Sequence, residues 1–172
     1  MPRIEALTPK FATKDRFALI ELLMDVVEAG AAISFLPPMT EGEAGAFWDK
    51  ALSDLSHRSI LVARDAAGRI QGSVQLIPAA MPNQPHRAEI AKLLVHTKAR
   101  RKGIGRALML AAEAEAKSLG RTLLTLDTRR GDDGEALYRN LGYFEVGIIP
   151  RYAKNADGSF HDTVVFYKEL GA

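Results

Sequence analysis

The chain has 172 residues, the length of one domain, and its 47% hydrophobic and 26% charged residues exclude a disordered or fibrous protein. The absence of cysteine excludes disulfide frameworks, thiolate metal sites and cysteine nucleophiles, and the four histidines lack the spacing of metal ligands. A net charge of +2 does not by itself indicate a nucleic-acid partner, so we expect neither nucleic acid nor metal to bind.

The N-terminal residues do not resemble a targeting signal. Residues 1–14 alternate apolar and charged side chains and lack the apolar stretch of a signal peptide. No part of the chain has the run of about 18 apolar residues that a membrane span needs. We therefore expect one domain over residues 1–172, located in the cytoplasm and without membrane contact.

Two helices are predicted in the first third of the chain. A short strand at residues 4–7 precedes apolar residues spaced three and four apart between Asp15 and Gly30, a pattern that predicts a helix. The loop that follows contains Phe35 and two consecutive prolines. A capping box, Thr40 with Glu43 three residues later, begins the second predicted helix.

The rest of the chain alternates strands and helices. Residues 59–63 and 70–77 form a predicted β-hairpin, and residues 88–95 form the next strand. Then come a helix at 103–119, a strand at 122–127, a short helix at 133–140, and strands at 143–149 and 163–168. This order predicts a mixed α/β (α+β) fold around one central sheet.

The segment between the strand at 88–95 and the helix at 103–119 has an anion-binding pattern. Gly103 and Gly105 allow close backbone approach, and the first N–H groups of a helix are unpaired donors suited to phosphate. A P-loop is excluded because Arg-Ala follows Gly105, and a dinucleotide fingerprint is excluded because residue 108 is leucine. Cations surround the glycines without an intervening carboxylate: Lys98, Arg100, Arg101, Lys102 and Arg106. The alternative is a solvated basic surface.

Two motifs resemble the GNAT superfamily of N-acetyltransferases. Arg100, Gly103 and Gly105 match its pyrophosphate-binding signature Arg/Gln-x-x-Gly-x-Gly/Ala, which follows a strand end similar to residues 93–95. Residues 136–147 resemble its downstream motif, a short helix with a tyrosine, then Gly-Tyr and a strand. Within the superfamily the chain is most similar to the tabtoxin-resistance type, in residues 87–95, 126–128, 150–152 and 157–158.

The resemblance implies a mostly antiparallel sheet of six or seven strands flanked by about four helices. It also implies acetyl-CoA as acetyl donor, the primary amine of a small molecule as acceptor, and direct transfer in a ternary complex without a metal. Dimers are common among such proteins, so a homodimer is one possible state. The donor-binding residues carried over from the family are Leu93, Leu94, Val95, Arg100, Arg101, Lys102, Gly103, Ile104, Gly105 and Arg106.

Three side chains are candidates for proton transfer. Tyr138, at the family's tyrosine position, is the candidate acid for the departing thiolate; alternatively its ring packs on the sheet with a satisfied hydroxyl group. Glu89 and Asp127, in or at the end of central strands, are candidate bases for the acceptor amine. Alternatively Glu89 forms a salt bridge with Arg87 or Lys92, and Asp127 accepts hydrogen bonds from nearby backbone.

The acceptor site is less well defined by the sequence. Phe35 is a candidate for lining the acceptor pocket, and Arg151 with Tyr152, expected in a loop after a strand, for binding an acceptor carboxylate. Three other functions stay open: a protein N-terminal or lysine acetyltransferase, a non-catalytic acyl-CoA sensor, and a nucleic-acid-binding domain that uses the basic loop.

Overall fold

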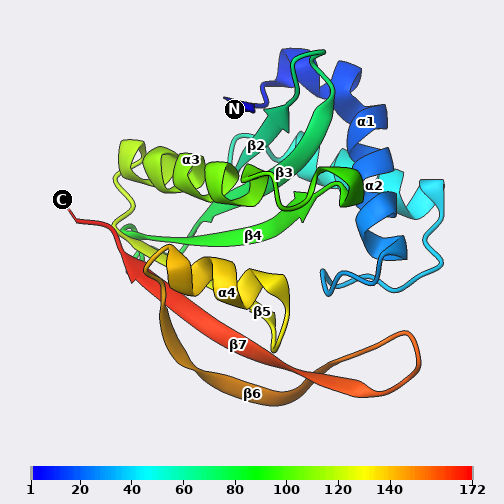
Figure 1. Ribbon diagram of the computed structural model, residues 1–172. Coiled ribbons are helices and arrows are strands. Elements are labelled where there is room, and N and C mark those ends of the chain that lie inside the picture. Colours follow the sequence, from blue (N-terminus) through cyan, green and yellow to red (C-terminus); the bar gives the residue numbers. More distant parts are fainter. Residues whose placement is uncertain (1, 172) are drawn as a thin grey trace.

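The computed structural model describes residues 2–171, apart from the side chains of residues 11 and 12, and arranges them around one sheet (Figure 1). The strands are β1 (Arg3–Ala6), β2 (Ser59–Arg64), β3 (Ile70–Pro78), β4 (Arg87–Val95), β5 (Leu123–Arg129), β6 (Phe144–Lys154) and β7 (Phe160–Glu169). The helices are α1 (Pro9–Glu28), α2 (Glu41–Ser53), α3 (Ile104–Ser118) and α4 (Asp133–Asn140), with a 3-10 helix at Thr97–Ala99.

The sheet has the strand order β1-β2-β3-β4-β5-β7-β6, and only β4 and β5 are parallel neighbours. The predicted mixed α/β fold with a mostly antiparallel sheet is confirmed. The parallel pairing joins residues 87–89 to residues 123–125 and extends no further along β4. The two strands therefore separate beyond Glu89, which leaves room for a cleft in the middle of the sheet.

Helices cover the two faces of the sheet unequally. α3 and α4 lie on one face, where Leu108 and Tyr138 join a core that contains Leu124 and Phe166 (Figure 1). α1 and α2 cover the other face over the N-terminal strands, in a second core built around Trp48. No helix in residues 2–171 is long and apolar enough to cross a membrane.

Three elements extend three or more residues beyond their predicted bounds. α1 begins at Pro9 rather than near Asp15, because proline is favoured in a first helical turn; Asp15 therefore lies inside the helix. β6 and β7 continue to either side of the turn at Asn155–Ser159. The pairing of β6 with β7 is irregular between residues 145 and 147 and between residues 149 and 153. These irregularities interrupt the alternation of apolar and polar residues along β6, so the sequence pattern that predicts a strand ends before the strand does.

A buried ion pair attaches α1 to the sheet. Asp15 lies 2.6 Å from the guanidinium group of Arg64, and both side chains are at most 10% exposed. Asp15→Asn leaves a buried arginine with Glu5 as its remaining acidic partner, so we expect the free energy of unfolding to fall by about 2–3 kcal/mol. The exposed Arg16–Asp49 pair supplies the control. We expect Asp49→Asn to lower the free energy of unfolding, measured by urea denaturation, by less than about 1 kcal/mol. Equal losses in the two variants would contradict this assignment.

Candidate functional site

The separation of β4 from β5 coincides with a β-bulge in β4. Lys92 and Leu93 together face the single residue Val74 of β3, since the pairing steps from Gln75–Ala91 to Ser73–Leu94. Lys92 has a positive φ of 53°, an uncommon conformation for a residue with a long side chain. The run of apolar residues at 93–95 thus follows a β-bulge. Backbone polar groups released from the β ladder are thereby available at the cleft.

The loop after β4 presents unpaired backbone donors. Gly103 precedes α3 with φ +79°, Arg101 has φ +59°, and no side chain caps the helix. The first helical hydrogen bond to this loop is donated by Ala107, so the N–H groups of residues 104–106 have no acceptor within the helix. Such a loop at a helix N-terminus binds phosphate groups. The residues thus fit the pyrophosphate of a CoA-type ligand.

The basic side chains of this loop differ in where they point. Arg100 donates a long hydrogen bond (3.4 Å) to the carbonyl oxygen of Val95 and lines the cleft. Arg101 and Arg106 line it as well. Lys102 instead donates to the carbonyl oxygen of Lys98 (3.0 Å), and its side chain is not part of the cleft wall.

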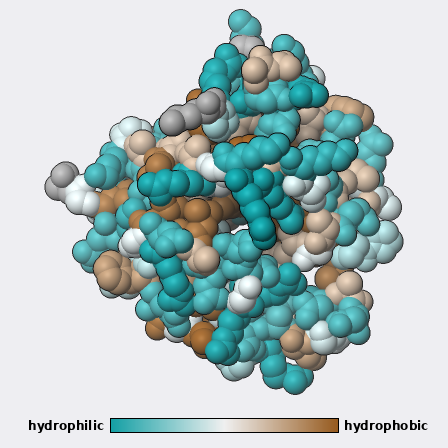
Figure 2. All heavy atoms as spheres, viewed as in Figure 1, coloured by the Kyte–Doolittle hydropathy of each residue, from teal (hydrophilic) through white to brown (hydrophobic). Residues whose placement is uncertain are grey.

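The cleft is a cavity of about 950 Å³ between the β4–α3 and β5–α4 units. From the side shown in Figure 1, hydrophobic side chains lie in a hollow between α3 and α4 and hydrophilic ones surround it (Figure 2). Most of the predicted site residues line this cleft: Glu89, Leu93, Leu94, Val95, Arg100, Arg101, Gly103, Ile104, Gly105, Arg106, Asp127, Tyr138 and Tyr152.

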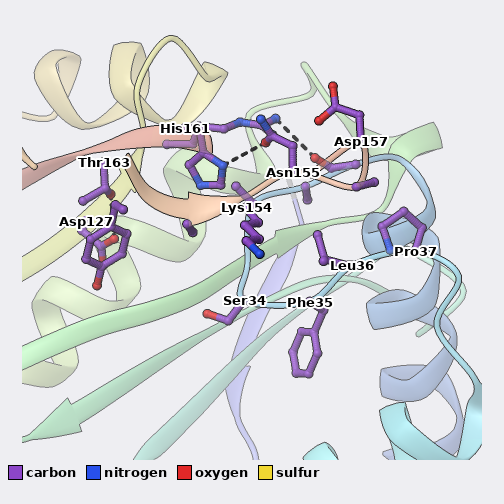
Figure 3. A pocket seen from close by; sticks show the side chains of 17 residues that line it. Ser34, Phe35, Leu36, Pro37, Asp127, Lys154, Asn155, Asp157, His161 and Thr163 are labelled. Atoms are coloured by element: carbon purple, nitrogen blue, oxygen red, sulfur yellow. Dashed lines mark hydrogen bonds between the residues drawn. The ribbon is translucent and has the colours of Figure 1, made fainter. Parts of the chain in front are cut away.

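A second cavity of about 690 Å³ adjoins the cleft (Figure 3). Phe35, with the other residues of the 30–37 loop, forms one wall, and the ends of β6 and β7 form the opposite wall. Asp127 and Tyr152 line both cavities. A donor in the cleft and an acceptor in the second cavity would therefore meet near Asp127.

Tyr138, the candidate acid, lies on α4 and packs into the core on that face of the sheet. It is 7% exposed, and its ring packs against Tyr143 and Phe166 with centroid distances of 6.0 Å. Its hydroxyl group forms no hydrogen bond with another described residue but, unlike that of Tyr143, is not shut off from solvent. Burial, and secondarily the charge of Asp127, raises the pKa of Tyr138 well above its usual value. The phenol is therefore protonated throughout the physiological pH range.

The two candidate bases have different surroundings. One oxygen of Asp127 lies 2.8 Å from the Thr163 hydroxyl group, rather than accepting from backbone. Glu89 lines the cleft and forms no ion pair among the described residues. Arg87, a possible partner in the sequence, binds the side chain of Gln84 instead.

Two functional candidates were missed in the sequence. Lys92 was considered only as an ion-pair partner of Glu89, yet its ammonium group contacts the 30–37 loop and lies in the field of Asp127 and Glu89. Arg129 donates to Asp132 (2.9 Å), to Asn155 and to a loop carbonyl group, and so connects the walls of the second cavity. Both are basic residues of strands that line the cleft, and only the three-dimensional pairing shows what they contact.

The expected loop at residues 151–152 is wrong, because both residues belong to β6. Arg151 has φ +52°, and its guanidinium group stacks on the ring of Phe160 at 4.3 Å. It lines neither cavity, since the irregular pairing of β6 turns it toward the outside of the hairpin. Tyr152, by contrast, faces both cavities.

Comparison with known proteins agrees with this arrangement. The sequence profile of the Acetyltransferase (GNAT) family matches residues 30–143. An Azospirillum brasilense protein described as an uncharacterized N-acetyltransferase in the hisH-hisA intergenic region is 33% identical over 119 residues, 68% of this chain and 70% of that protein.

Solved acetyltransferase structures have the same fold. An N-acetyltransferase from Staphylococcus aureus Mu50 superposes with a TM-score of 0.82 at 18% identity, over 99% of both chains. The protein yncA from Salmonella typhimurium, solved with its cofactor acetyl-CoA, superposes with a TM-score of 0.80 at 18% identity. The superposition covers 100% of this chain and 95% of yncA. A ribosomal-protein-alanine N-acetyltransferase from Brucella melitensis superposes with a TM-score of 0.80 at 24% sequence identity. The superposition covers 98% of this chain and 99% of that protein.

Proposed function

The chain belongs to the GNAT family of acetyltransferases, and we propose that it moves the acetyl group of acetyl-CoA to the primary amine of a small molecule by direct transfer. One observation carries the proposal. An anion-binding loop, a bulged strand end and a protonated buried tyrosine line a single cleft, and a second cavity joins this cleft at Asp127. We further propose, from the resemblance of residues 87–95 and 150–152, that the subfamily is the tabtoxin-resistance type.

The residues at the mouth of α3 would hold the donor. The free N–H groups of residues 104–106 and the guanidinium groups of Arg100 and Arg101 suit its pyrophosphate. The backbone of residues 93–95, beyond the bulge, suits the pantetheine arm. Acetyl-CoA, when bound, supplies the activated acetyl thioester. The presence of acetyl-CoA in the Salmonella structure of the same fold supports this assignment.

The second cavity supports a small acceptor. Its walls, the Phe35 loop and the β6–β7 hairpin, stand on opposite sides of the space beside Asp127 (Figure 3). A cavity of about 690 Å³ bounded by these walls has room for a small amine. The alternative acceptor is a protein α-amine or lysine, the first of which is the substrate named for the Brucella structure.

In the proposed reaction each proton has a stated destination. Glu89 or Asp127, directly or through a water molecule, takes a proton from the acceptor ammonium group. The neutral nitrogen attacks the carbonyl carbon, the N–C bond forms, and backbone N–H groups at the β4 bulge stabilise the charge that develops on oxygen. The C–S bond then breaks, and Tyr138 gives its proton to the departing sulfur. The second proton of the attacking nitrogen passes to Tyr138, directly or through water, which restores the phenol and leaves the neutral amide.

The acceptor class is tested by measuring CoA release with a thiol reagent. The panel contains amino acids, amino acid amides, polyamines, and peptides with a free N-terminus or an internal lysine. We expect a small amine to give the highest kcat/KM. Faster release with the peptides would favour the protein acetyltransferase. Acetyl-CoA binding without release for any amine would favour a non-catalytic sensor.

Glu89→Gln is expected to lower kcat by about 10–100-fold at neutral pH, because a general base is lost while Asp127 remains. The rate should partly recover as pH rises, since the free amine then becomes available without enzymic deprotonation. The check is a pH–rate profile of the variant beside Asp127→Asn. A Glu89→Gln profile identical to that of the unmodified protein would remove Glu89 as the base.

A further inference from the structure

A half-buried lysine, Lys92, lines the same cleft as both candidate bases. Lys92, at the β4 bulge, donates hydrogen bonds to the carbonyl oxygen of Ile33 (2.9 Å) and to the hydroxyl group of Ser34 (3.1 Å). Its nitrogen is also 5.7 Å from the centre of the Phe35 ring. Ser34 (φ 73°) and Lys92 (φ 53°) both have a positive φ. The hydrogen bond between them therefore joins two residues in an uncommon backbone conformation. The ammonium group is thereby fixed against the loop that lines both cavities.

Two carboxylates act on this ammonium group. Asp127 on β5 and Glu89 on β4 both favour its charged form, although burial lowers the pKa of Lys92 below its usual value. Neither carboxylate forms a direct ion pair with it among the described residues. The two hydrogen bonds to oxygen atoms favour the charged form as well.

Other charged groups lie on the elements around Lys92. The loop at residues 31–36 has no ionisable side chain. On α1, the Asp25 carboxylate accepts hydrogen bonds from Thr97 and lies 3.4 Å from His96, and on β5, Arg129 is paired with Asp132. The arginines that line the cleft belong to the donor-binding loop: Arg100, Arg101 and Arg106. Lys92, Glu89 and Asp127 themselves carry two negative charges and one positive charge.

We propose that Lys92 is a positioning residue of the acceptor site, whose fixed ammonium group keeps the amine-binding carboxylates at one net negative charge. This inference rests on the proposed function. One net negative charge attracts the ammonium form of an acceptor. Two net negative charges would attract it more strongly but would also hold its proton, and the amine must lose that proton before it attacks.

The test uses ethylammonium, a small amine without other charges, as the probe. Its dissociation constant is measured by NMR titration of the full chain, and acetyl-CoA binding by calorimetry. We expect Lys92→Met to bind ethylammonium about 3- to 10-fold more tightly, because the substitution removes a repulsive unit charge from the cleft that both carboxylates line. With ethylamine as acceptor, the acidic limb of the kcat profile should move up by about one pH unit.

Two variants separate charge from structure. Lys92→Arg keeps the positive charge and should bind ethylammonium like the unmodified protein. The double variant Lys92→Met/Glu89→Gln restores one net negative charge and should return the affinity toward its original value.

Unchanged or weaker ethylammonium binding by a Lys92→Met protein that still binds acetyl-CoA would overturn the proposal. Lys92→Gln, which keeps a hydrogen-bond donor toward Ile33, serves the same purpose if the methionine variant does not fold. A failure of the unmodified chain to bind acetyl-CoA would instead contradict the proposed function, so the two failures are distinguishable.

Discussion

Replacing Gly105 with valine is expected to weaken acetyl-CoA binding at least 100-fold while the domain stays folded. A Cβ atom at this position would lie 3.4 Å from Leu137 and 3.8 Å from Val95, side chains on the two walls of the cleft. The branched γ-carbons of valine extend beyond that point, over the free N–H groups at the start of α3. They would therefore obstruct the approach of the pyrophosphate to those donors.

Gly105→Ala is the matched control for this prediction. Its single added carbon makes ordinary van der Waals contacts, so binding should stay within a few-fold of the original. Gly103→Val should also lose binding, but its backbone has φ +79°, and strain of about 1–2 kcal/mol would accompany the steric effect. Calorimetric titration, with circular dichroism as the check on folding, measures all three. Undiminished binding by Gly105→Val would remove the loop from the donor site.

Tyr138→Phe is expected to lower kcat by about 100- to 1000-fold, with acetyl-CoA affinity within a few-fold of the original. The ring contacts with Tyr143 and Phe166 do not involve the hydroxyl group, so phenylalanine should preserve the packing. What the variant loses is the proton for the departing sulfur.

The pH dependence adds a second readout for Tyr138. Burial raises its pKa, so the unmodified enzyme should show no loss of activity from Tyr138 deprotonation between pH 6 and about 9. Steady-state kinetics with the best amine of the panel, beside calorimetry with acetyl-CoA, provides the comparison. Equal losses of turnover and affinity would reassign Tyr138 to donor binding. Unchanged turnover would favour a sensor or another proton donor.

The donor side of the site was predictable because it is local in sequence. The strand end, the glycine loop and the start of α3 are consecutive, and helix N-termini bind anions for reasons that a sequence pattern expresses. The capping box at Thr40 was equally readable, and both of its hydrogen bonds are present. Tyr138 could be placed through its position in the downstream motif, although its ring contacts with Tyr143 and Phe166 became visible only in three dimensions.

The acceptor side was less predictable because it is assembled from distant segments. Lys92 meets Ser34 across 58 positions of the chain, and Arg129 meets the 30–37 loop across 99. Arg151 was expected in a loop because irregular pairing in β6 interrupts the period-two pattern, so the recognisable strand pattern ends before this residue. Asp15 was read as a helix start because an isolated aspartate is common there, whereas its buried partner Arg64 lies on β2.

The most direct test of the account is a thermal unfolding series with acetyl-CoA, CoA, ATP, NAD and a short RNA at equal concentrations. A ligand present at 100 times its dissociation constant increases the free energy of unfolding by about 2.7 kcal/mol. For a chain of this size, such an increase raises the Tm by roughly 5–10 °C. The account predicts this rise with acetyl-CoA and CoA alone. No rise with either ligand, or a larger rise with RNA, would contradict a CoA-binding cleft between β4 and β5.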